Sequence, residues 1–538
     1  MRLSLVSMVA LLLVLLPVDV ASPAPPGGVV AGHVKDALER PLPGARVRLE
    51  ATDGRVVAAT TADDQGAFIF RGVAPGTYAV VGEKDAFESA TAIVTVTETE
   101  GASPELALVS RQPLDLRVAA KRLEEERIRI QPRIGASTYE ITSRAIDTQP
   151  GGENNALPRI LLQAPGVSQD SSSAGSIHVR EQMGNIQYRL NGIALPEGAT
   201  LFGQSGGLSP RLASSITLLT GTLPAEYGLR TTGIFDIQTK SGAFEPGGYL
   251  AMYGGSHAWM QPSAEYRGAV GRFNYFVTGD YLQNGIGISP ATPDGAIHDD
   301  TRQGHGFGYF EYLLDATSKV SAIVGSFVGH FQIPNRPGVS PVFTVNGVSG
   351  FDSSRVDETQ TEQNHFAVLS YLKAAPGLSV QVATFARYSR VSFRPDPLAD
   401  LLFNGIAQRV DRSSIATGLQ MDGGYALTPT HSLHGGLYLA AERTSVQATS
   451  DVLPAVDGVP TSDQPFRVFD SRGKTGYTYS VYLQDAWRVV PTVTINGGLR
   501  LDGLEAFTSE WQLSPRLNVV WEATPSTTVH AGYARYFT

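Results

Sequence analysis

Apolar and polar residues alternate with a period of two along much of the chain beyond about residue 248. In Val493–Asp502 the apolar side chains fall on one face and the polar ones on the other, and Ser432–Glu442 and Arg516–Ala523 repeat the pattern. A period of two with one apolar face is typical of a half-buried β-strand. The second half of the chain is therefore predicted to consist of β-strands.

Short and long connections alternate between these strands. Tight turns are expected near Val270–Arg272, Asp315–Lys319, Ala375–Leu378, Thr428–His431, Val490–Val493 and Thr524–Thr527. Longer polar stretches lie between them at Asn284–Gln303, Gln332–Thr361, Ser392–Arg412 and Ala448–Lys474. Aromatic residues crowd the strand ends, as they do at membrane interfaces. This arrangement is typical of a transmembrane barrel with turns inside and loops outside.

A large soluble sandwich or propeller would also contain many strands. The sequence shows no repeated blade motif, however, and a sandwich seldom places all its long loops at one end. We therefore expect residues 243–538 to form an antiparallel transmembrane β-barrel. About 13 strands fit, whereas a barrel with a plugged lumen has about 22. The barrel is thus expected to be incomplete and the chain a fragment; a closed barrel of about 12 or 14 strands is the alternative.

The N-terminus resembles a secretory signal peptide. Arg2 precedes an apolar run from Leu5 to Leu16, and small residues follow as far as Ala24. The run is too short to cross a bilayer as a helix. Residues 1–24 are therefore predicted to be a signal peptide of an exported protein, with the cleavage site left open.

Composition excludes several functions. The chain has 538 residues, 57 of them Gly, and only 17% are charged, which suits turns and lipid-facing strands. A net charge of −9 without a basic run argues against a nucleic-acid partner. The absence of Cys excludes disulfides, thiolate metal sites and cysteine nucleophiles. The sequence also contains neither a serine nucleophile elbow nor a P-loop.

Residues 27–109 contain many short strand patterns. The expected strands are Val29–Lys35, Ala45–Ala51, Val56–Thr61, Ala67–Phe70, Thr77–Gly82 and Thr91–Val96. Turn signals such as Asp53-Gly54 and Pro75-Gly76 separate them. This density of short strands predicts a small β-sandwich.

The same residues resemble the carboxypeptidase regulatory-like domain, which has a transthyretin-like fold. The resemblance rests on Gly32-x-Val34-x-Asp36, Leu42-Pro43-Gly44-Ala45-x-Val47, Gly66-x-Phe68 and Pro75-Gly76-x-Tyr78. Zinc carboxypeptidase chemistry needs two His and a Glu around the metal, whereas this unit has one His, His33. A binding or spacer module is therefore expected here, and not an enzyme.

Residues 110–133 are rich in charge and are predicted to be a solvated linker. Within them Leu114-Asp115-Leu116-Arg117-Val118-Ala119-Ala120 alternates like an isolated strand. An extended segment in a linker can add itself to the edge of a partner's sheet.

Residues 134–242 mix helix and strand patterns. Helices are expected at Ser143–Thr148 and Leu157–Ala164, and strands at Ser176–Arg180, Gln187–Leu190, Ile216–Thr220 and Gly233–Thr239. An α+β domain of about a hundred residues fits this pattern.

Several of its motifs resemble the plug domain of TonB-dependent outer-membrane receptors. They are Leu157-x-x-Ile160-Leu161-x-x-x-Pro165-Gly166-Val167, Gln187-Tyr188-Arg189-Leu190-Asn191-Gly192-Ile193 and Pro224-Ala225-Glu226-Tyr227-Gly228. Barrel motifs of that family recur as Tyr482-Leu483-Gln484-Asp485-Ala486-Trp487, Gly498-Leu499-Arg500-x-Asp502 and Leu513-Ser514-Pro515-Arg516. The resemblance extends from about Ile134 to the C-terminus.

The resemblance implies a receptor in the bacterial outer membrane, with its N-terminal domain in the periplasm. The plug would gate the barrel, and a TonB complex would energise import of a siderophore, an oligosaccharide or a peptide. Leu114–Ala120 would be the candidate TonB box, although Asp115 and Arg117 interrupt its apolar pattern. Outer loops would hold much of the ligand specificity.

Charged plug residues expected to face the barrel wall are Arg180, Glu181, Arg189, Glu226 and Arg230. Paired charges in a wet lumen can exchange for water at modest cost, although ordinary surface ion pairs are the alternative. His298, Asp299, Asp300 and His305 could bind a cation, but chance clustering explains them as well, and we expect no metal or cofactor. A non-transporting adhesion protein and an exported enzyme are the competing functions.

Overall fold

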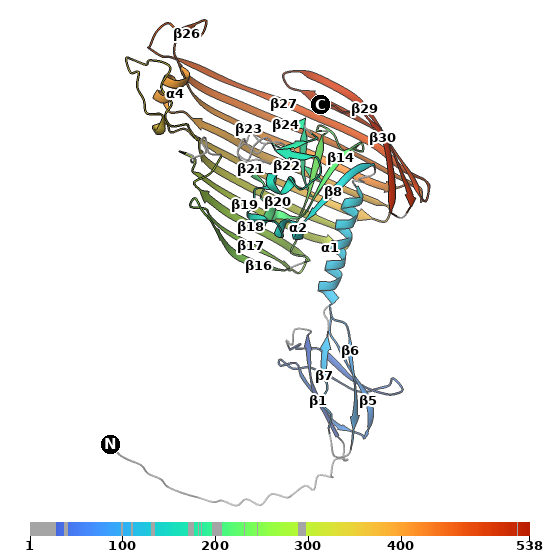
Figure 1. Cartoon of the computed structure of the whole chain (residues 1–538). Coiled ribbons are helices and arrows are strands. Elements are labelled where there is room, and N and C mark those ends of the chain that lie inside the picture. The colour runs from blue at the N-terminus through green and yellow to red at the C-terminus, as the bar shows by residue number, and fades with distance from the viewer. Residues whose placement is uncertain are drawn as a thin grey trace, which may run out of the picture. The chain divides into compact units, whose positions relative to one another are not determined.

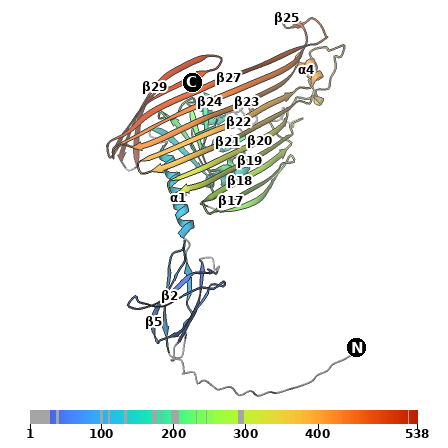
Figure 2. The ribbon, with the colours of Figure 1, turned by 180° about the vertical axis from the view of Figure 1, so that it is seen from behind.

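The structure is a computed structural model. It describes residues 28–36, 41–97, 101–108, 111–130, 135–169, 177–180, 182–183, 185–195, 207–230, 232–244, 246–288, 297–524 and 526–537. The predicted signal peptide at residues 1–24 lies outside them. The chain divides into two compact units, Met1–Asp115 and Leu116–Thr538. Figures 1 and 2 show both from opposite sides.

The N-terminal unit is a β-sandwich, as predicted. One sheet has the order β4-β1-β7 and the other the order β3-β2-β5-β6. The strands are β1 (Gly28–Asp36), β2 (Arg46–Ala51), β3 (Val56–Thr61), β4 (Ala67–Val73), β5 (Gly76–Glu83), β6 (Ala90–Val96) and β7 (Glu105–Leu108). Alternate residues such as Val47, Leu49, Phe68 and Leu106 fill one core between the sheets. The six predicted strands are confirmed, and β7 is additional.

The turn before β4 explains the Asp63…Gly66 spacing. The Asp63 carboxylate accepts hydrogen bonds from the backbone N–H groups of Gln65 at 2.9 Å and Ala67 at 2.8 Å. Gly66 has a φ of +71°, and a Cβ there would lie 2.5 Å from the carbonyl oxygen of Val34. Only glycine satisfies both demands.

The prediction of a linker with an extended segment at Leu114–Ala120 was wrong. Residues Arg111–Ile130 form the helix α1. Its buried side chains include Ala120, Leu123, Arg127 and Ile130, which follow a helical spacing of three and four residues. The seven-residue alternation was too short to reveal this longer period.

The α+β domain, residues 135–242, contains a five-stranded sheet with the order β13-β12-β15-β14-β8 and a small sheet β11-β10-β9. Its elements are β8 (Ala136–Thr142), α2 (Ser143–Asp147), η1 (Gly152–Asn154), α3 (Leu157–Leu161), β9 (Val167–Gln169), β10 (Ile177–Val179), β11 (Gln182–Met183), β12 (Ile186–Leu190), β13 (Ile193–Ala194), η3 (Pro210–Leu212), β14 (Ala213–Gly221) and β15 (Gly233–Thr239). Both predicted helices and all four predicted strands are present. Strand β8 forms one edge of the larger sheet.

The remaining chain forms one antiparallel sheet of 13 strands in sequential order, with β16 and β30 at the ends. Its strands are β16 (Gly247–Gly254), β17 (Met260–Val270), β18 (Phe273–Asn284), β19 (Thr301–Asp315), β20 (Ser318–Gln332), β21 (Thr359–Ala375), β22 (Leu378–Arg394), β23 (Ile406–Ala426), β24 (His431–Val452), β27 (Phe466–Val490), β28 (Val493–Glu505), β29 (Ser509–Thr524) and β30 (Thr527–Ala534). The expected 13 strands and the six tight turns are confirmed. The sheet curves around the α+β domain (Figures 1 and 2).

The two faces of this sheet differ as the alternation predicts. Polar side chains such as Glu265, Gln381 and Arg500 are buried on the concave face, whereas Leu369, Leu483 and other apolar side chains are exposed on the convex face. An apolar outer band is the surface that lipid covers in a transmembrane barrel. Among the helices in the described ranges, none has the length and apolar character needed to cross a membrane.

Three strands are longer than the sequence pattern predicts. Strands β23, β24 and β27 have 21, 22 and 25 residues and continue into polar stretches expected to be loops. The loop before β23 contains α4 (Pro397–Asn404), and the loop between β24 and β27 contains β25 (Ala455–Val456) and β26 (Val459–Pro460). A further helical turn, η4 (Ser353–Arg355), lies in the loop between β20 and β21. Apolar alternation cannot reveal a strand that is polar on both faces.

The turn before β4 gives a test of the N-terminal fold. Gly66→Ala should destabilise this unit by about 1–3 kcal/mol more than Gly54→Ala, because only the first variant pushes a Cβ into backbone. Gly54 also has a positive φ, +83°, but nothing lies within 4 Å of its Cβ position. Calorimetric unfolding of the whole chain measures both variants. Equal effects would contradict the close-packing argument.

Candidate functional site

A loop of the α+β domain is fixed to the sheet through Arg516. The Arg516 Nη1 atom donates to the carbonyl oxygens of Leu223 at 2.9 Å, Pro224 at 2.8 Å and Tyr227 at 2.8 Å. The guanidinium also lies over the ring of Tyr536, 4.3 Å from its centroid. The buried guanidinium of Arg516, on β29, thus donates hydrogen bonds to three loop carbonyl groups that are not part of a β-sheet ladder.

Arg500 on β28 binds the same loop. Its Nη1 atom donates to the carbonyl oxygens of Ala225 at 3.1 Å and Glu226 at 3.3 Å, while its Nε atom pairs with Asp502 at 2.8 Å. A Cβ at Gly228 would lie 2.1 Å from the Arg500 Nε atom. The motif Pro224–Gly228 and the two arginine motifs of the sheet therefore meet in space, and Gly228 is the residue that allows the close approach.

Amide and hydroxyl groups complete this contact, which we call the arginine anchor (residues 223–228 with Gln484, Arg500, Arg516 and Tyr536). Ala225 donates its N–H to the side-chain oxygen of Gln484 at 2.8 Å, and Leu223 donates its N–H to the Tyr536 hydroxyl at 2.8 Å. The loop thus finds both donors and acceptors on the sheet, as buried backbone must.

The five predicted wall-facing residues have different positions. Arg189 and Glu226 are buried beside Arg500 and Tyr482 of the sheet, and Arg189 lies 4.5 Å from the centroid of the Tyr227 ring. Arg180 donates to Thr220 at 3.2 Å, inside the α+β domain. Arg230 is half-buried, and Glu181 lies outside the described residues. The wall-facing role of the set stays a prediction.

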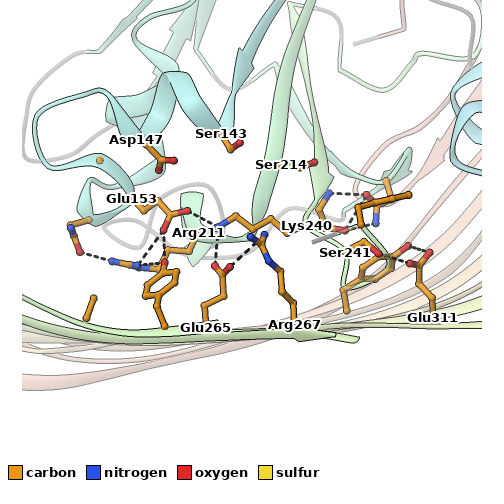
Figure 3. Close-up of a pocket in the computed structure, with 18 of the residues that line it drawn as sticks. Ser143, Asp147, Glu153, Arg211, Ser214, Lys240, Ser241, Glu265, Arg267 and Glu311 are labelled. Carbon is orange, nitrogen blue, oxygen red and sulfur yellow. Dashed lines mark hydrogen bonds and ion pairs between the residues drawn. The ribbon is translucent and has the colours of Figure 1, made fainter. Parts of the chain in front are cut away.

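A second contact lies on the opposite part of the sheet and involves Arg211 and Lys240, which the sequence analysis missed. The Lys240 Nζ atom lies 2.6 Å from Glu153 of its own domain and 2.8 Å from Glu265 on β17. Arg211 donates to the Tyr249 hydroxyl on β16 at 3.0 Å. Figure 3 shows Glu265 and its neighbours rising from the sheet toward these cations.

A cavity of about 870 Å³ adjoins this second contact. Residues from α1, α2, η1, η3, β14 and β15 and from the sheet strands β16, β17, β19 and β20 line it. The acidic residues are Glu124, Asp147, Glu153, Glu265 and Glu311, and the basic ones are Arg211, Lys240, Arg267 and Lys319. Burial and the nearby charge of Glu153 raise the pKa of Asp147, against the opposing charge of Lys240. Such a charged space is suited to water.

Helix α1 lies against the turn-end of the sheet. Arg127 is buried and hydrogen-bonds to Glu124 and to Gln238 of β15. Burial alone would raise the pKa of Glu124, but the positive charges of Arg127 and Lys319 outweigh it and lower the pKa to about 2. The carbonyl oxygen of Ile130 accepts from the His434 imidazole at 3.1 Å. The candidate TonB box, Leu114–Ala120, is thus part of a docked helix.

The outer loops pack on one another. Val345, Leu401, Leu402, Ala407 and Leu453 form a small apolar core from three different loops. The residues considered as a possible cation cluster have separate partners: His305 pairs with Asp280 at 3.1 Å on the concave face, while His298 contacts the carbonyl of Val356. In the part of the chain that the structure describes, no group of three or more His, Asp or Glu is placed to hold a metal ion.

The arginine anchor predicts a specific effect of Arg516→Lys. The lysine keeps the charge, but a compact ammonium cannot reproduce the planar guanidinium that spans three carbonyls. Hydrogen exchange at Leu223 and Ala225 should accelerate, corresponding to a loss of about 1–3 kcal/mol in opening free energy. Arg472→Lys is the control, because Arg472 pairs with Asp470 in an outer strand. If the exchange rates of Leu223 and Ala225 in Arg516→Lys equal those of the unaltered chain, Arg516 does not stabilise this loop.

The outer loops should loosen as pH rises. Burial, and the hydrogen bond and charge of Asp400, raise the pKa of Glu358 to about 8. The folded loops thus retain a proton that the unfolded chain loses near pH 4.3, so stability falls with rising pH between about 4.3 and 8. Hydrogen exchange of Val342–Val345 at pH 5 and pH 8 tests this. Glu358→Gln should reduce the pH dependence to the part contributed by Asp400, whose pKa burial also raises, whereas Asp357→Asn, at an exposed neighbour, should leave it unchanged.

Two family models match the sequence. Residues 292–538 match the TonB dependent receptor-like β-barrel, and residues 29–109 match the carboxypeptidase regulatory-like domain. No curated protein sequence matches the chain.

Solved structures share the fold of the second unit. The ferric yersiniabactin uptake receptor FyuA from Yersinia pestis is 14% identical, with a TM-score of 0.58 over 74% of this chain and 63% of its own length. The ferric citrate transporter FecA is 14% identical, with a TM-score of 0.55 over 74% and 62%. The pyoverdine receptor FpvA from Pseudomonas aeruginosa PAO1 gives the same four values as FecA. The chain thus spans less than two thirds of the length of these structures. Residues 292–538 thus match the β-barrel of TonB-dependent receptors, which are outer-membrane proteins, and residues 29–109 match a carboxypeptidase regulatory-like domain.

Proposed function

We propose that this chain is the receptor for active import of a scarce or bulky ligand, with the α+β domain acting as the plug. The proposal rests on one observation: the sheet contacts this domain in two chemically different ways. The arginine anchor grips backbone atoms on one side, whereas a charged cavity and ion pairs occupy the other. Such a domain can be held in place and still yield on one side.

The connection to helix α1 suggests where force would act. Strand β8 is the next element along the chain, and it pairs only with β14 at the edge of its sheet. Tension on α1 would therefore reach an edge strand before a central one. Helix α2 and η1, which line the cavity, follow directly. Pulling this part away would enlarge the cavity while the arginine anchor keeps the rest in place.

The ion pairs beside the cavity favour such a movement. Lys240 bridges Glu153 on the α+β domain and Glu265 on the sheet. When the partners separate, water can enter from the cavity and solvate each charge, which offsets much of the lost attraction. An apolar contact of the same area would expose hydrophobic surface instead.

The source of the force follows from the family resemblance. We propose that the TonB complex binds Leu114–Ala120 after this part of α1 has unwound, because strand addition needs extended backbone. Unwinding of this segment releases Leu116 and Ala120 from the apolar cluster that contains Leu313 and Leu372 of the sheet. The first unit would lie in the periplasm, ahead of this segment.

A ferric siderophore is the first ligand class to test. The similar structures are an uptake receptor for ferric yersiniabactin, a ferric citrate transporter and a pyoverdine receptor. In this chain, the packed outer loops offer a surface for such a ligand. Oligosaccharides and peptides are the other classes.

Deletion of Leu114–Ala120 tests the proposal in cells that carry the full-length gene. Uptake of ⁵⁵Fe from ferric citrate, ferric yersiniabactin and ferric pyoverdine should fall to the level of the gene deletion, because the force can no longer reach the plug. Binding to cells at 0 °C should persist. Lys121→Ala, an exposed position of the same helix, is the control and should import normally.

Two outcomes would contradict the proposal. Full uptake by the deletion variant would exclude this segment as the TonB box. Surface binding without energy-dependent uptake of any tested ligand by the unaltered protein would favour the adhesion alternative.

A further inference from the structure

The upper half of β27 has a free edge. On one side β27 pairs with β24 along its whole upper part, from Phe466↔Val452 to Gly476↔Glu442. On the other side β28 begins to pair only at Tyr477↔Glu505. Within the described ranges, no strand pairs with the second edge of Phe466–Gly476.

The register shows which backbone groups point outward. Arg488 donates its N–H to the carbonyl oxygen of Thr430, on the β24 side. The β24–β27 register is unbroken from there to Phe466, so even-numbered residues face β24 and odd-numbered ones face the other way. The free edge therefore presents the N–H and C=O groups of Arg467, Phe469, Ser471, Gly473 and Thr475.

This edge lies beyond the membrane. The lower part of β27 carries outward-facing Tyr477, Tyr479, Val481 and Leu483, all exposed on the convex face, as expected of a lipid-facing band with an aromatic rim. Phe466–Gly476 continues from that rim toward the long loops, which are extracellular in such barrels. Every residue from Phe466 to Thr475 is exposed.

Most of the usual protections of an edge strand are missing. Natural edges are blocked by proline, bulges, short length, covering segments or charged side chains, and of these only charged side chains are present. Phe466–Gly476 contains no proline, and its register has no bulge. Its side chains include Phe466 and Phe469, which are 51% and 74% exposed. A long, regular and partly aromatic edge is a template for an added strand.

Charge indicates the kind of strand that fits. The edge carries Arg467, Arg472 and Lys474 against one carboxylate, Asp470. Arg472 pairs with Asp470 at 2.9 Å and Lys474 lies 5.3 Å from the centroid of the Phe507 ring, but the Arg472–Asp470 pair is exposed and such pairs exchange readily for other partners. On the occupied side, Asp451 of β24 already pairs with Arg467 through two bonds of 2.7 and 2.9 Å. A neighbour with carboxylates at matching positions therefore suits this strand.

We propose that Phe466–Gly476 is a docking edge for an extended acidic segment of a second protein outside the cell, which joins the sheet as an added strand. Backbone hydrogen bonds from the five odd-numbered residues supply affinity, and Phe466, Phe469 and the basic side chains supply selectivity. This interaction is independent of ligand import. A second copy in the same membrane does not suit the edge, because both copies of β27 run from the loop end to the turn end and cannot align antiparallel.

The probe for the test is a fluorescent peptide with the sequence of β24 residues 442–452, ERTSVQATSDV. This sequence already fits the other edge of the same strand. The purified chain in detergent micelles should bind it with a micromolar dissociation constant, measured by fluorescence anisotropy. A peptide N-methylated at alternate residues on its pairing edge should bind at least tenfold more weakly.

Ser471→Pro is the decisive variant, since it removes one outward N–H and leaves the bonds to β24 in place. It should weaken peptide binding at least tenfold, while the matched Ser471→Ala should not. A double variant, Arg472→Glu with Lys474→Glu, covers the case that the proline variant does not fold. In the β24 register, Thr444 and Val446 of the peptide stand opposite Lys474 and Arg472. The double variant should therefore lose a peptide with Thr444→Glu and Val446→Glu, which the unaltered chain binds, and should bind a peptide with lysine at both positions.

The proposal is overturned if the unaltered chain does not bind the peptide, or if Ser471→Pro binds it as tightly. It is also overturned if light scattering shows a dimer of the chain that Ser471→Pro abolishes, because the occupant would then be a second copy.

Discussion

The arrangement of the second unit depends on hydrogen bonds from barrel arginines to backbone carbonyls. The loop Leu223–Gly228 passes through the interior of the curved sheet without belonging to any strand. Its carbonyl groups must still find donors, because a buried unpaired carbonyl costs about 1–3 kcal/mol. Arg516 and Arg500 satisfy five of them. Since the bonds reach backbone atoms, they fix the path of the loop and not merely one side chain.

This constraint also explains why one side of the domain can yield. Guanidinium groups bound to several carbonyls lose all partners at once when the loop leaves, so that side resists separation. At the cavity, Lys240 and Arg211 hold side-chain carboxylates and a hydroxyl, and water can replace those partners one at a time. The two contacts therefore differ in their resistance to separation because one binds backbone carbonyls and the other binds side chains. They need not differ in the number of hydrogen bonds.

The sequence could reveal those parts whose pattern is local. Alternation in Val493–Asp502, turn residues and the motif Pro224–Gly228 predicted the 13 strands, the sandwich and the family. Helix α1 was missed because a charged stretch hides a stripe of only a few apolar residues, among them Leu123 and Ile130. Lys240 and Arg211 were missed for another reason. Their side-chain partners lie 25 to 87 residues away in sequence, and pairing over such distances depends on how the sheet curves.

The polar upper strands show a further limit of sequence patterns. Beyond the membrane a strand no longer needs an apolar face, so its alternation disappears although its hydrogen bonding continues. In β23, β24 and β27 the ladder persists because neighbouring strands have similar lengths and because cross-strand pairs such as Asp451–Arg467 stabilise it. Where lengths differ, as between β27 and the shorter β28, the ladder stops and leaves backbone groups exposed. The unpaired edge is therefore a direct consequence of unequal strand length. Its residues lie beyond the membrane, so they need not be apolar and can carry charged side chains.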